Sequence, residues 1–173
     1  MNDHRLPSVR LRAIEPEDLD ILYRIENDMQ LWGVGSTNVP YSRYTLHDYV
    51  ARSSGDIYAD RQVRLVIENT DGQVLGLADL VSFDPRHLRA EVGIVIEKPF
   101  RHSGYAQAAL AALHHYARSI LHLHQLYAIV DEANSPAQSL FRSTGYTCNA
   151  TLADWLYNGN SYANAQLWQL TLL

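Results

Sequence analysis

Apolar and polar positions alternate along this chain with two different periods, and the changes between these periods predict its elements. A period of two over residues 9–14 predicts a half-buried strand, and apolar residues then recur at helical spacing through residues 19–29. The acidic turn before them, residues 15–18, contains Pro16 and is typical of a helix start. A second short helix is expected over residues 45–52.

Strands and helices alternate in the rest of the chain. Residues 63–68 and 73–81 predict two strands joined by Asp71-Gly72, a dipeptide typical of tight hairpins, and a third strand is expected over residues 89–97. The pattern then predicts a helix over 105–121, a strand over 125–130, a helix over 137–143 that starts at Asn134-Ser135-Pro136 and stops at Gly145, and a hairpin that turns at Asn158-Gly159 and ends with a strand over 162–172.

This order of elements predicts the fold class. One strand, two helices, three strands, a helix, a strand, a helix and two strands give an α/β fold with a mixed sheet, in which antiparallel hairpins flank a strand–helix–strand middle. Neither repeats nor a linker interrupts the chain. Residues 1–173 are therefore expected to form a single domain.

Composition narrows the class of protein without identifying it. Hydrophobic residues make up 47% of the 173 positions and charged residues 19%, as in ordinary globular proteins. The formal net charge of −5 argues against nucleic acid as the main partner. The single Cys148 excludes an internal disulfide, and the sequence shows neither a basic leader nor an apolar run of membrane-spanning length. These features predict a cytoplasmic protein without a membrane partner.

The most informative segment joins the strand over 89–97 to the helix that follows it. Between them stands Arg101-His102-Ser103-Gly104-Tyr105-Ala106, which places a glycine at the start of a helix. The first N–H groups of a helix have no partner within the helix, and they carry the positive end of its dipole. The loop therefore predicts a phosphate site, and a phosphorylated cofactor is the expected ligand.

This loop, together with Asn134 and the segment Phe141-Arg142-Ser143-Thr144-Gly145-Tyr146, resembles the GNAT family of acetyl-CoA-dependent N-acetyltransferases. The likeness spans nearly the whole chain. Within the family it is greatest to the spermidine and diamine acetyltransferases and to the enzymes that modify ribosomal-protein termini. It implies a mixed, mostly antiparallel central sheet flanked by helices, with a splayed pair of parallel strands in the middle.

The resemblance also implies where acetyl-CoA binds. The pyrophosphate is expected on the backbone of the glycine loop, and the pantetheine arm is expected to pair with the preceding strand. In the family this strand carries a bulge, and one of its N–H groups stabilises the oxyanion. The residues expected to contact the cofactor are Ile94, Val95, Ile96, Arg101, His102, Ser103, Gly104, Tyr105, Ala106, Asn134 and Phe141.

An acceptor amine must lose a proton before it attacks, because an alkylamine with a pKa of about 10.4 is neutral in only about one molecule in 10³ near pH 7. In many members of the family a carboxylate on the cofactor strand serves as the base. Glu91 and Glu97 share one face of this strand by alternation. We expect Glu91 to be the base and Glu97 to be the second choice, with ion pairs to Arg89 or Lys98 as the structural alternative.

The usual proton donor of the family is missing. A tyrosine four residues before the glycine protonates the leaving thiolate in relatives, and this chain has Phe141 there, which carries no hydroxyl. Tyr146 is the replacement expected by residue type. A water molecule, the attacking ammonium, Tyr105, Tyr157 and Tyr162 are alternatives. The missing hydroxyl also allows a different function, a protein that binds CoA as a sensor without efficient catalysis.

The residues expected around the acceptor are Glu26, Asp28, Trp32 and Tyr41, because carboxylates and aromatic ring faces can hold a cation. The polyamine enzymes of the family carry several carboxylates in the loop after the first helix, and residues 36–42 of this chain contain none. The expected acceptor is a primary amine of a polyamine-like small molecule. The α-amino group of a peptide or protein is the alternative.

Two further expectations concern metals and oligomers. The eight histidines form no His-x-x-x-His pair and no cysteine cluster accompanies them, so no metal is expected. A homodimer is the oligomer usual for relatives.

Overall fold

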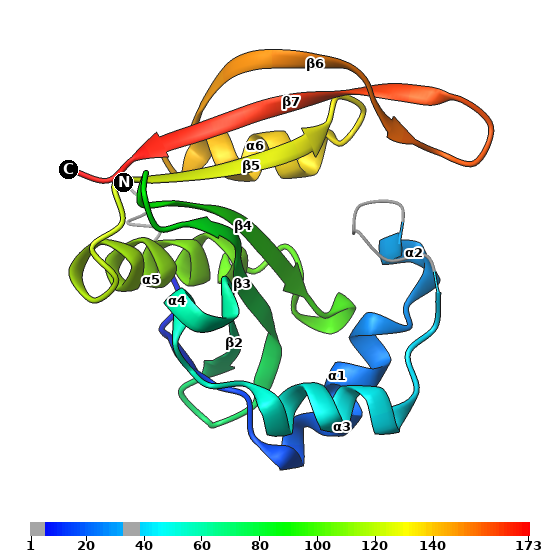
Figure 1. Ribbon diagram of the computed structural model, residues 1–173, viewed down its shortest axis with the longest axis vertical. Helices are drawn as coiled ribbons and strands as arrows, with labels where there is room; N and C mark the ends of the chain where they lie inside the picture. Colours follow the sequence, from blue (N-terminus) through cyan, green and yellow to red (C-terminus); the bar gives the residue numbers. More distant parts are fainter. Residues whose placement is uncertain (1–5, 33–38) are drawn as a thin grey trace.

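A single seven-stranded sheet organises the molecule in the computed structural model, which describes residues 6–32 and 39–173 (Figure 1). Its strands are β1 (Val9–Ala13), β2 (Val63–Asn69), β3 (Val74–Asp84), β4 (Arg89–Ile96), β5 (Gln125–Asp131), β6 (Thr147–Tyr157) and β7 (Tyr162–Thr171). They lie in the order β1-β2-β3-β4-β5-β7-β6. Every neighbouring pair is antiparallel except β4 and β5.

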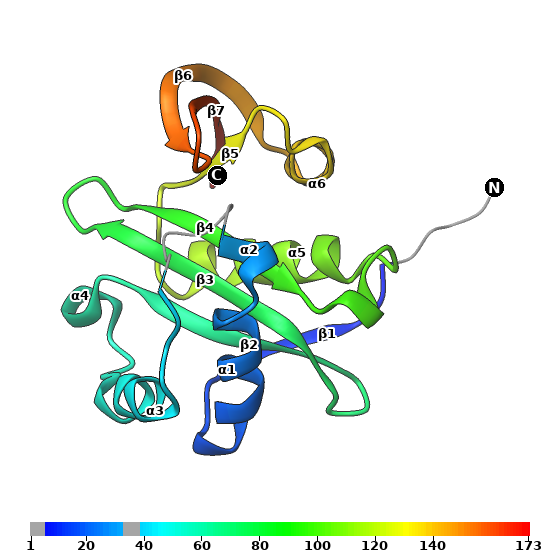
Figure 2. The ribbon, with the colours of Figure 1, turned by 90° about the vertical axis from the view of Figure 1, so that its right-hand side faces the viewer.

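Helices cover both faces of this sheet (Figure 2). They are α1 (Leu19–Glu26), α2 (Met29–Trp32), α3 (Arg43–Arg52), α4 (Ile57–Asp60), α5 (Tyr105–Ser119) and α6 (Ser135–Ser143), with short 3₁₀ turns at Pro16–Asp18 and Lys98–Phe100. The α1 and α3 helices pack on one face of β2 and β3, whereas α5 packs on the opposite face of the sheet and α6 packs against α5 and β6. None of the described helices is long and apolar enough to cross a bilayer.

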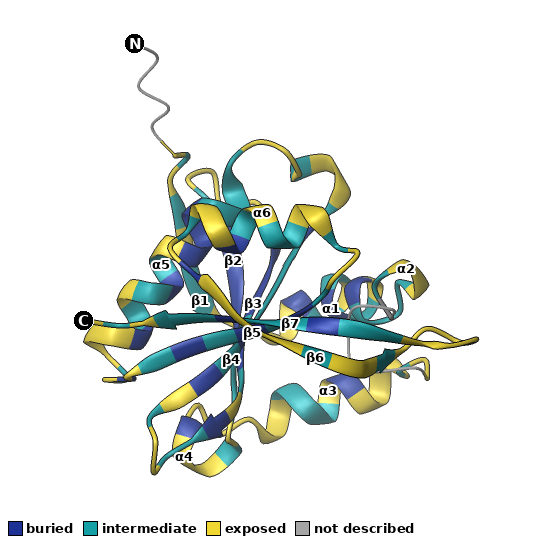
Figure 3. Ribbon diagram, turned by 90° about the horizontal axis from the view of Figure 1, so that it is seen from above, coloured by how far each residue is buried: buried dark blue, intermediate teal, exposed yellow. Residues whose placement is uncertain are grey.

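The apolar residues form two clusters, one on each face. The larger one joins α5 and α6 to the sheet through Leu110, Leu113, Leu126 and other buried side chains. The smaller one joins α1 and α3 to the sheet around Leu22 and Val66. Figure 3 shows the buried positions gathered along α5 and the inner strands, whereas β6, at the edge of the sheet, is exposed over most of its length.

Both predicted hairpins are confirmed. Gly72 turns β2 into β3 with φ +75°, and Gly159 turns β6 into β7 with φ +98°. Positive φ is the backbone conformation that tight hairpin turns require and that glycine adopts without strain.

The first helical region differs from the prediction. One helix was expected through Met29, but α1 ends at Glu26 and a separate turn, α2, follows. The break occurs because the Asn27 side chain binds the backbone of Tyr41, accepting from its N–H at 2.7 Å and donating to its carbonyl at 3.0 Å. The irregular segment predicted after α2 lies largely at residues 33–38, outside the described residues.

The central prediction of the fold, a splayed parallel pair, is confirmed. The β4 and β5 strands pair only from Arg89–Gln125 to Glu91–Tyr127, and beyond that rung they carry no further pairing. The expectation of a bulge in β4 is wrong, because β4 keeps an unbroken register with β3 from Ile96 to Glu91. The irregularity lies on β3 instead, between Val81 and Asp84.

One glycine sets how closely β3 approaches β4. A Cβ atom on Gly76 would lie 1.9 Å from the carbonyl oxygen of Val95, far inside any allowed contact. Only glycine lets the two backbones meet at this rung.

Candidate active site

The opening between β4 and β5 exposes backbone groups of β4 that the sheet does not use. The N–H of Glu97 donates to Leu75 on β3 at 2.9 Å, so alternation turns the backbone groups of Ile96 and Ile94 toward the opening and those of Val95 toward β3. The carbonyl of Ile96 accepts from Arg101 Nε at 2.8 Å. Of the three predicted strand contacts, Ile94 is therefore the one placed to pair with an extended ligand.

The predicted glycine loop forms an anion cradle at the start of α5. Gly104 is the N-cap residue with φ +81°, and the first backbone hydrogen bond of the helix runs from Ala108 to the Gly104 carbonyl at 3.0 Å. Within the described part of the chain, the N–H groups of residues 102–107 have no hydrogen-bond acceptor. This arrangement suits a pyrophosphate, because several unpaired N–H groups point outward at the positive end of a helix dipole.

The cradle is crowded on its protein side. A Cβ on Gly104 would lie 3.1 Å from Pro7 Cδ and 3.7 Å from Leu6. Beside it, a hollow of roughly 330 Å³ opens between α5 and α6. It is lined by Leu6, Gln107, Ala111, His114, Ser143 and Thr144.

The two predicted cofactor contacts on α6 have structural roles of their own. The Asn134 side chain caps the helix by accepting from the Ala137 N–H at 3.1 Å. Phe141 is only 5% exposed, and its ring packs edge-on against Tyr146 with the centroids 5.0 Å apart. Each lies beside β5, and little of the Phe141 ring faces solvent.

The placement of Tyr146 does not favour its predicted role as the acid. Its side chain is 3% exposed, and its hydroxyl bonds to His114 Nε2 of α5 at 3.1 Å. Burial raises the pKa of Tyr146 and lowers the pKa of His114 to about 4. The turn at Gly145, with φ +96°, directs the chain so that Tyr146 enters the core. A hydroxyl enclosed in this way cannot reach a thiolate in the opening.

Glu91 occupies the last paired rung of the parallel strands, opposite Tyr127. It is half-buried, and burial raises the pKa of its carboxyl. Glu97, the second choice for the base, forms an ion pair with Arg24 of α1 at 2.8 Å. A base needs a free carboxylate near the reacting atoms, and Glu91 meets this condition better than Glu97.

The predicted acceptor residues are only partly brought together. Glu26 reaches the sheet, where Arg64 binds both its carboxylate, at 2.5 Å, and that of Asp79, at 2.8 Å. Asp28 instead accepts from the Gln30 N–H at 3.0 Å. Tyr41 packs with the α1–α3 cluster, and the side chain of Trp32 lies outside the described part of the chain.

Three residues near Glu91 were missed by the sequence reasoning, namely Ser82, Arg64 and Tyr127. Arg64 could have been noticed, because it is a charged residue within the apolar run at residues 63–67. The other two depend on pairing between distant segments, for which the sequence gives no local signal.

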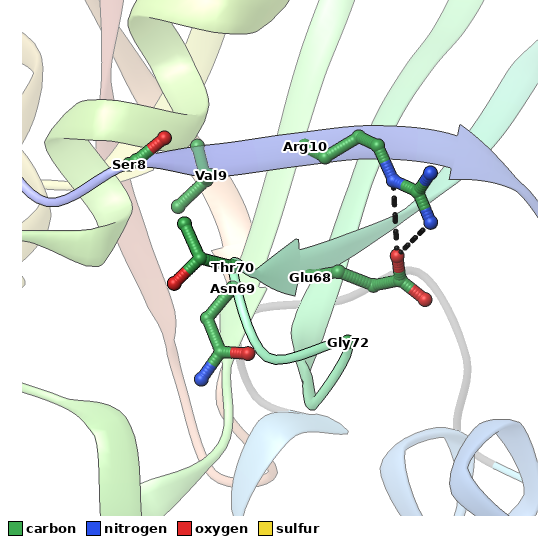
Figure 4. A pocket seen from close by; sticks show the side chains of 7 residues that line it. All are labelled: Ser8, Val9, Arg10, Glu68, Asn69, Thr70 and Gly72. Atoms are coloured by element: carbon green, nitrogen blue, oxygen red, sulfur yellow. Dashed lines mark hydrogen bonds and ion pairs between the residues drawn. The ribbon is translucent and has the colours of Figure 1, made fainter.

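A second hollow, of roughly 360 Å³, lies at the outer strands near the β2–β3 turn (Figure 4). Its lining residues are Ser8, Val9, Arg10, Glu68, Asn69, Thr70 and Gly72. Glu68 is already paired with Arg10 at 2.6 Å and with Arg12 at 2.5 Å, and these guanidinium groups hold the pKa of its carboxyl below the usual range. The described residues contain no group of three or more His, Cys, Asp or Glu side chains arranged to hold a metal.

Known proteins resemble this chain in both sequence and fold. A family model described as "Acetyltransferase (GNAT) domain" matches residues 8–147. The spermidine N(1)-acetyltransferase of Escherichia coli K12 is 31% identical over 162 residues, which cover 91% of this chain and 83% of that protein. The spermidine N(1)-acetyltransferase of Vibrio cholerae is 23% identical over 156 residues, which cover 90% and 88%.

A solved structure supports the same fold. The spermidine N-acetyltransferase from Vibrio cholerae, in complex with CoA and spermine, superposes with a TM-score of 0.83, at 23% identity and with 95% of each chain covered. The family model and the Escherichia coli relative confirm the predicted family, and with it the predicted enzyme class and donor. The chain belongs to the GNAT family of acetyltransferases.

Proposed function

We propose that this GNAT acetyltransferase moves the acetyl group of acetyl-CoA directly to a primary amine of a polyamine. The observation that carries the proposal is the opening of β4 from β5 beyond Glu91, beside the unpaired N–H groups at the start of α5. The N–H groups of residues 102–107 would bind the pyrophosphate, and the backbone of Ile94 would pair with the pantetheine arm. The proposed transfer does not pass through a covalent intermediate on Cys148, the single cysteine of the chain. That residue lies exposed on the edge strand β6.

The relatives support a polyamine as the acceptor. Two of them, at 31% and 23% identity over at least 90% of this chain, are spermidine N(1)-acetyltransferases. The fold match includes an enzyme solved with spermine and CoA. A polyamine offers primary ammonium groups, which must be deprotonated before they can attack.

Glu91 would take the proton of the ammonium, either directly or through a water molecule. Burial raises its pKa, which makes its carboxylate a stronger base than that of an exposed glutamate. Acetyl-CoA supplies the thioester carbon that the neutral nitrogen attacks. The half-buried position of Glu91 limits the access of bulk water to the proton that is being moved.

We propose that water returns a proton to the leaving sulfur. Phe141 cannot donate, and the Tyr146 hydroxyl is bound to His114. A thiol with a pKa near the ordinary value of about 8.5 leaves readily as the thiolate in mildly alkaline solution, so a dedicated acid contributes little there. Phe141→Tyr tests this point, because faster thiol release in that variant would show that the missing hydroxyl limits the enzyme.

The α-amino group of a peptide is the second candidate acceptor, and one observation favours it. Arg64 pairs with both Glu26 and Asp79, and Arg24 pairs with Glu97, so each of these three carboxylates already has an arginine partner. A second ammonium of a polyamine would have to compete with these arginines. An α-amino group has a pKa of only about 7.7–8.0 and needs less help from a base.

The deciding experiment offers acetyl-CoA with spermidine, spermine, a diamine or a short peptide and measures free thiol. We expect turnover with the polyamines, and turnover with the peptide alone would transfer the proposal to the second acceptor. CoA binding without turnover on any amine would favour the sensor. Glu91→Gln should lower kcat/KM by about 10²-fold or more, the usual contribution of a general base. The exposed Glu17→Gln is the matched control.

Three predictions from the sequence remain proposals for this chain. They are a cytoplasmic location, a single domain over residues 1–173 and a homodimer. Size-exclusion chromatography with light scattering measures the oligomer directly.

A further inference from the structure

The rung at which β4 and β5 separate carries a tyrosine beside the proposed base. Glu91 and Tyr127 are direct partners in the parallel register, so their side chains leave the sheet on the same face. Both are half-buried. The negative charge of Glu91 contributes to raising the pKa of the Tyr127 phenol after burial itself, which agrees with side chains that lie close together.

The β3 strand is irregular directly across from this rung. Ser82 and Phe83 together oppose Ala90, because the register shifts between Val81 and Asp84. Phe83 enters the core, whereas Ser82 stays exposed with φ +52°, a conformation that few non-glycine residues adopt. Bulges of this kind redirect single side chains and are frequent beside active sites.

The redirected serine meets the tyrosine. The Ser82 side chain lies close enough to the Tyr127 hydroxyl to lower its pKa, against the effect of burial. Because β4 lies between β3 and β5, this contact passes over β4 at the level of Glu91. Glu91 on β4 therefore lies between Tyr127 on β5 and the bulge of β3.

The other charged groups around this rung are already paired. Asp84 on β3 and Arg89 on β4 form an ion pair at 3.2 Å. Asp79, two residue pairs further along β3, is held by Arg64. Burial is accordingly the cause that raises the pKa of Glu91.

We propose that Tyr127, which pairs with Glu91 in register beside the β3 bulge, is a positioning residue that fixes the Glu91 carboxylate at the opening and shields it from water. This inference rests on the proposed role of Glu91 as the base. Tyr127 acts through Glu91 and does not itself exchange a proton with the substrates. Tyr127 does not replace the proton-donating hydroxyl that is missing at Phe141.

The proposal makes a signed prediction for the pH profile. Glu91 works as a base only when it is ionised, so kcat/KM falls as the pH drops through its pKa. Removal of the ring hydrates the carboxylate and lowers this pKa toward the ordinary value, so the acidic limb moves to lower pH. The plateau falls about tenfold at the same time, because the base is weaker and less well placed.

The experiment measures Glu91 in two independent ways. The carboxyl carbon of Glu91 is titrated by ¹³C NMR in the protein without substrates, and kcat/KM for acetyl-CoA with spermidine is followed against pH. The variants are Tyr127→Ala, Tyr127→Phe and Ser82→Ala. The two milder changes keep most of the packing and should shift both curves in the same direction by less. Tyr116→Phe on α5 is the matched control, since Tyr116 is also half-buried and burial also raises its pKa.

The outcomes separate this inference from the proposed function. Unchanged NMR titrations in folded Tyr127→Phe and Ser82→Ala variants overturn the positioning role. Loss of the alkaline limb instead of a shift of the acidic limb also overturns it, because Tyr127 would then be the acid. An NMR shift without a matching shift of the acidic limb supports the shielding but removes Glu91 as the base. Shifts in both curves support the inference.

Discussion

The two faces of the sheet meet at the β4–β5 opening, and they are built in different ways. On the α5–α6 face the polar groups near the opening are few, and His114 and Tyr146 bind each other within an apolar cluster. On the α1–α3 face ionised side chains bind one another, and Arg64 lies between Glu26 and Asp79. The cofactor side thus depends on backbone geometry and packing, whereas the acceptor side depends on paired charges.

This difference teaches which kind of substitution each side tolerates. The cradle at Gly104 uses N–H groups that every residue possesses, so only backbone conformation and space limit it. The α1–α3 face uses charged side chains that form ion pairs with one another. The loss of one partner therefore leaves an unpaired charge in a partly buried position. Four measurements test this difference between the two faces.

Arg64→Ala should have the largest effect. Its side chain is 22% exposed and joins two carboxylates that are less exposed still. Without the guanidinium, the two partly buried carboxylates lose their shared ion-pair partner. We therefore expect the free energy of unfolding to fall by about 3 kcal/mol. For a chain of this size that corresponds to a Tm lower by roughly 6–12 °C, measured by calorimetry.

Arg52→Ala is the control for that change. Arg52 is 79% exposed and pairs with Asp48 one turn away on α3. An exposed pair of this kind contributes about 0.5 kcal/mol or less. Equal losses in the two variants would contradict the picture of a charge-dependent acceptor face.

His114→Gln tests the apolar α5–α6 face through the pH dependence of the free energy of unfolding. Burial lowers the pKa of His114 to about 4 from 6.5, so the unfolded chain binds a proton that the folded protein excludes. Stability is therefore full above pH 6.5 and falls as the pH drops toward 4, by on the order of 2 kcal/mol after allowance for partial exposure. Urea unfolding across this window should show the slope in the wild type and a flatter line in the variant. The exposed neighbour, His115→Gln, should keep the wild-type slope.

Gly104→Ala tests the cradle. A methyl group there meets Pro7 at 3.1 Å and forces a positive φ on a residue with a Cβ. We expect CoA affinity to fall about tenfold, which is about 1.4 kcal/mol, by isothermal titration calorimetry.

Gly72→Ala carries a similar backbone strain at φ +75° with no neighbour within 4 Å. Both variants should lose about 1 kcal/mol of stability. A loss of CoA affinity in both would mean that strain alone, and not the cradle, explains the result.

Arg24→Gln should have the smallest effect. Its pair with Glu97 is largely exposed on the arginine side, so its removal should cost less than about 1 kcal/mol of unfolding free energy. Salt screens such a pair, and the difference from the wild type should shrink between 0.05 and 0.5 M NaCl, on the order of a change in screening length from 14 to 4 Å. Arg118→Gln, at the exposed last turn of α5, is the control. A difference that stays constant with salt would show a packing role for Arg24.

The cofactor side could be predicted from the sequence because its signals are local. Gly104 and the helix after it stand in one short segment, and the hairpin turn at Gly72 depends on two adjacent residues. The splayed strands followed from the family resemblance. In each case the relevant residues are close in sequence or occur in a recognised order.

The chemistry around the opening could not be predicted in the same way. His114 and Tyr146 are 32 positions apart, and only the packing of α5 against the segment after α6 joins them. The Ser82 contact with Tyr127 requires a shift in register on β3 that no residue type announces. Tyr146 was therefore predicted to be the acid by residue type alone, without sight of its burial and its bond to His114.

The close approach at Gly76 has a consequence for the reading of mutational scans. The carbonyl of Val95 leaves no room for even a methyl group there, so all nineteen other residues should score as inactive. Gly76 nevertheless lies on β3, with its backbone paired in the sheet and no side chain to offer either substrate. A scan that ranks positions by lost activity would place it beside Glu91, and only the amount of folded protein recovered from each variant would separate the two.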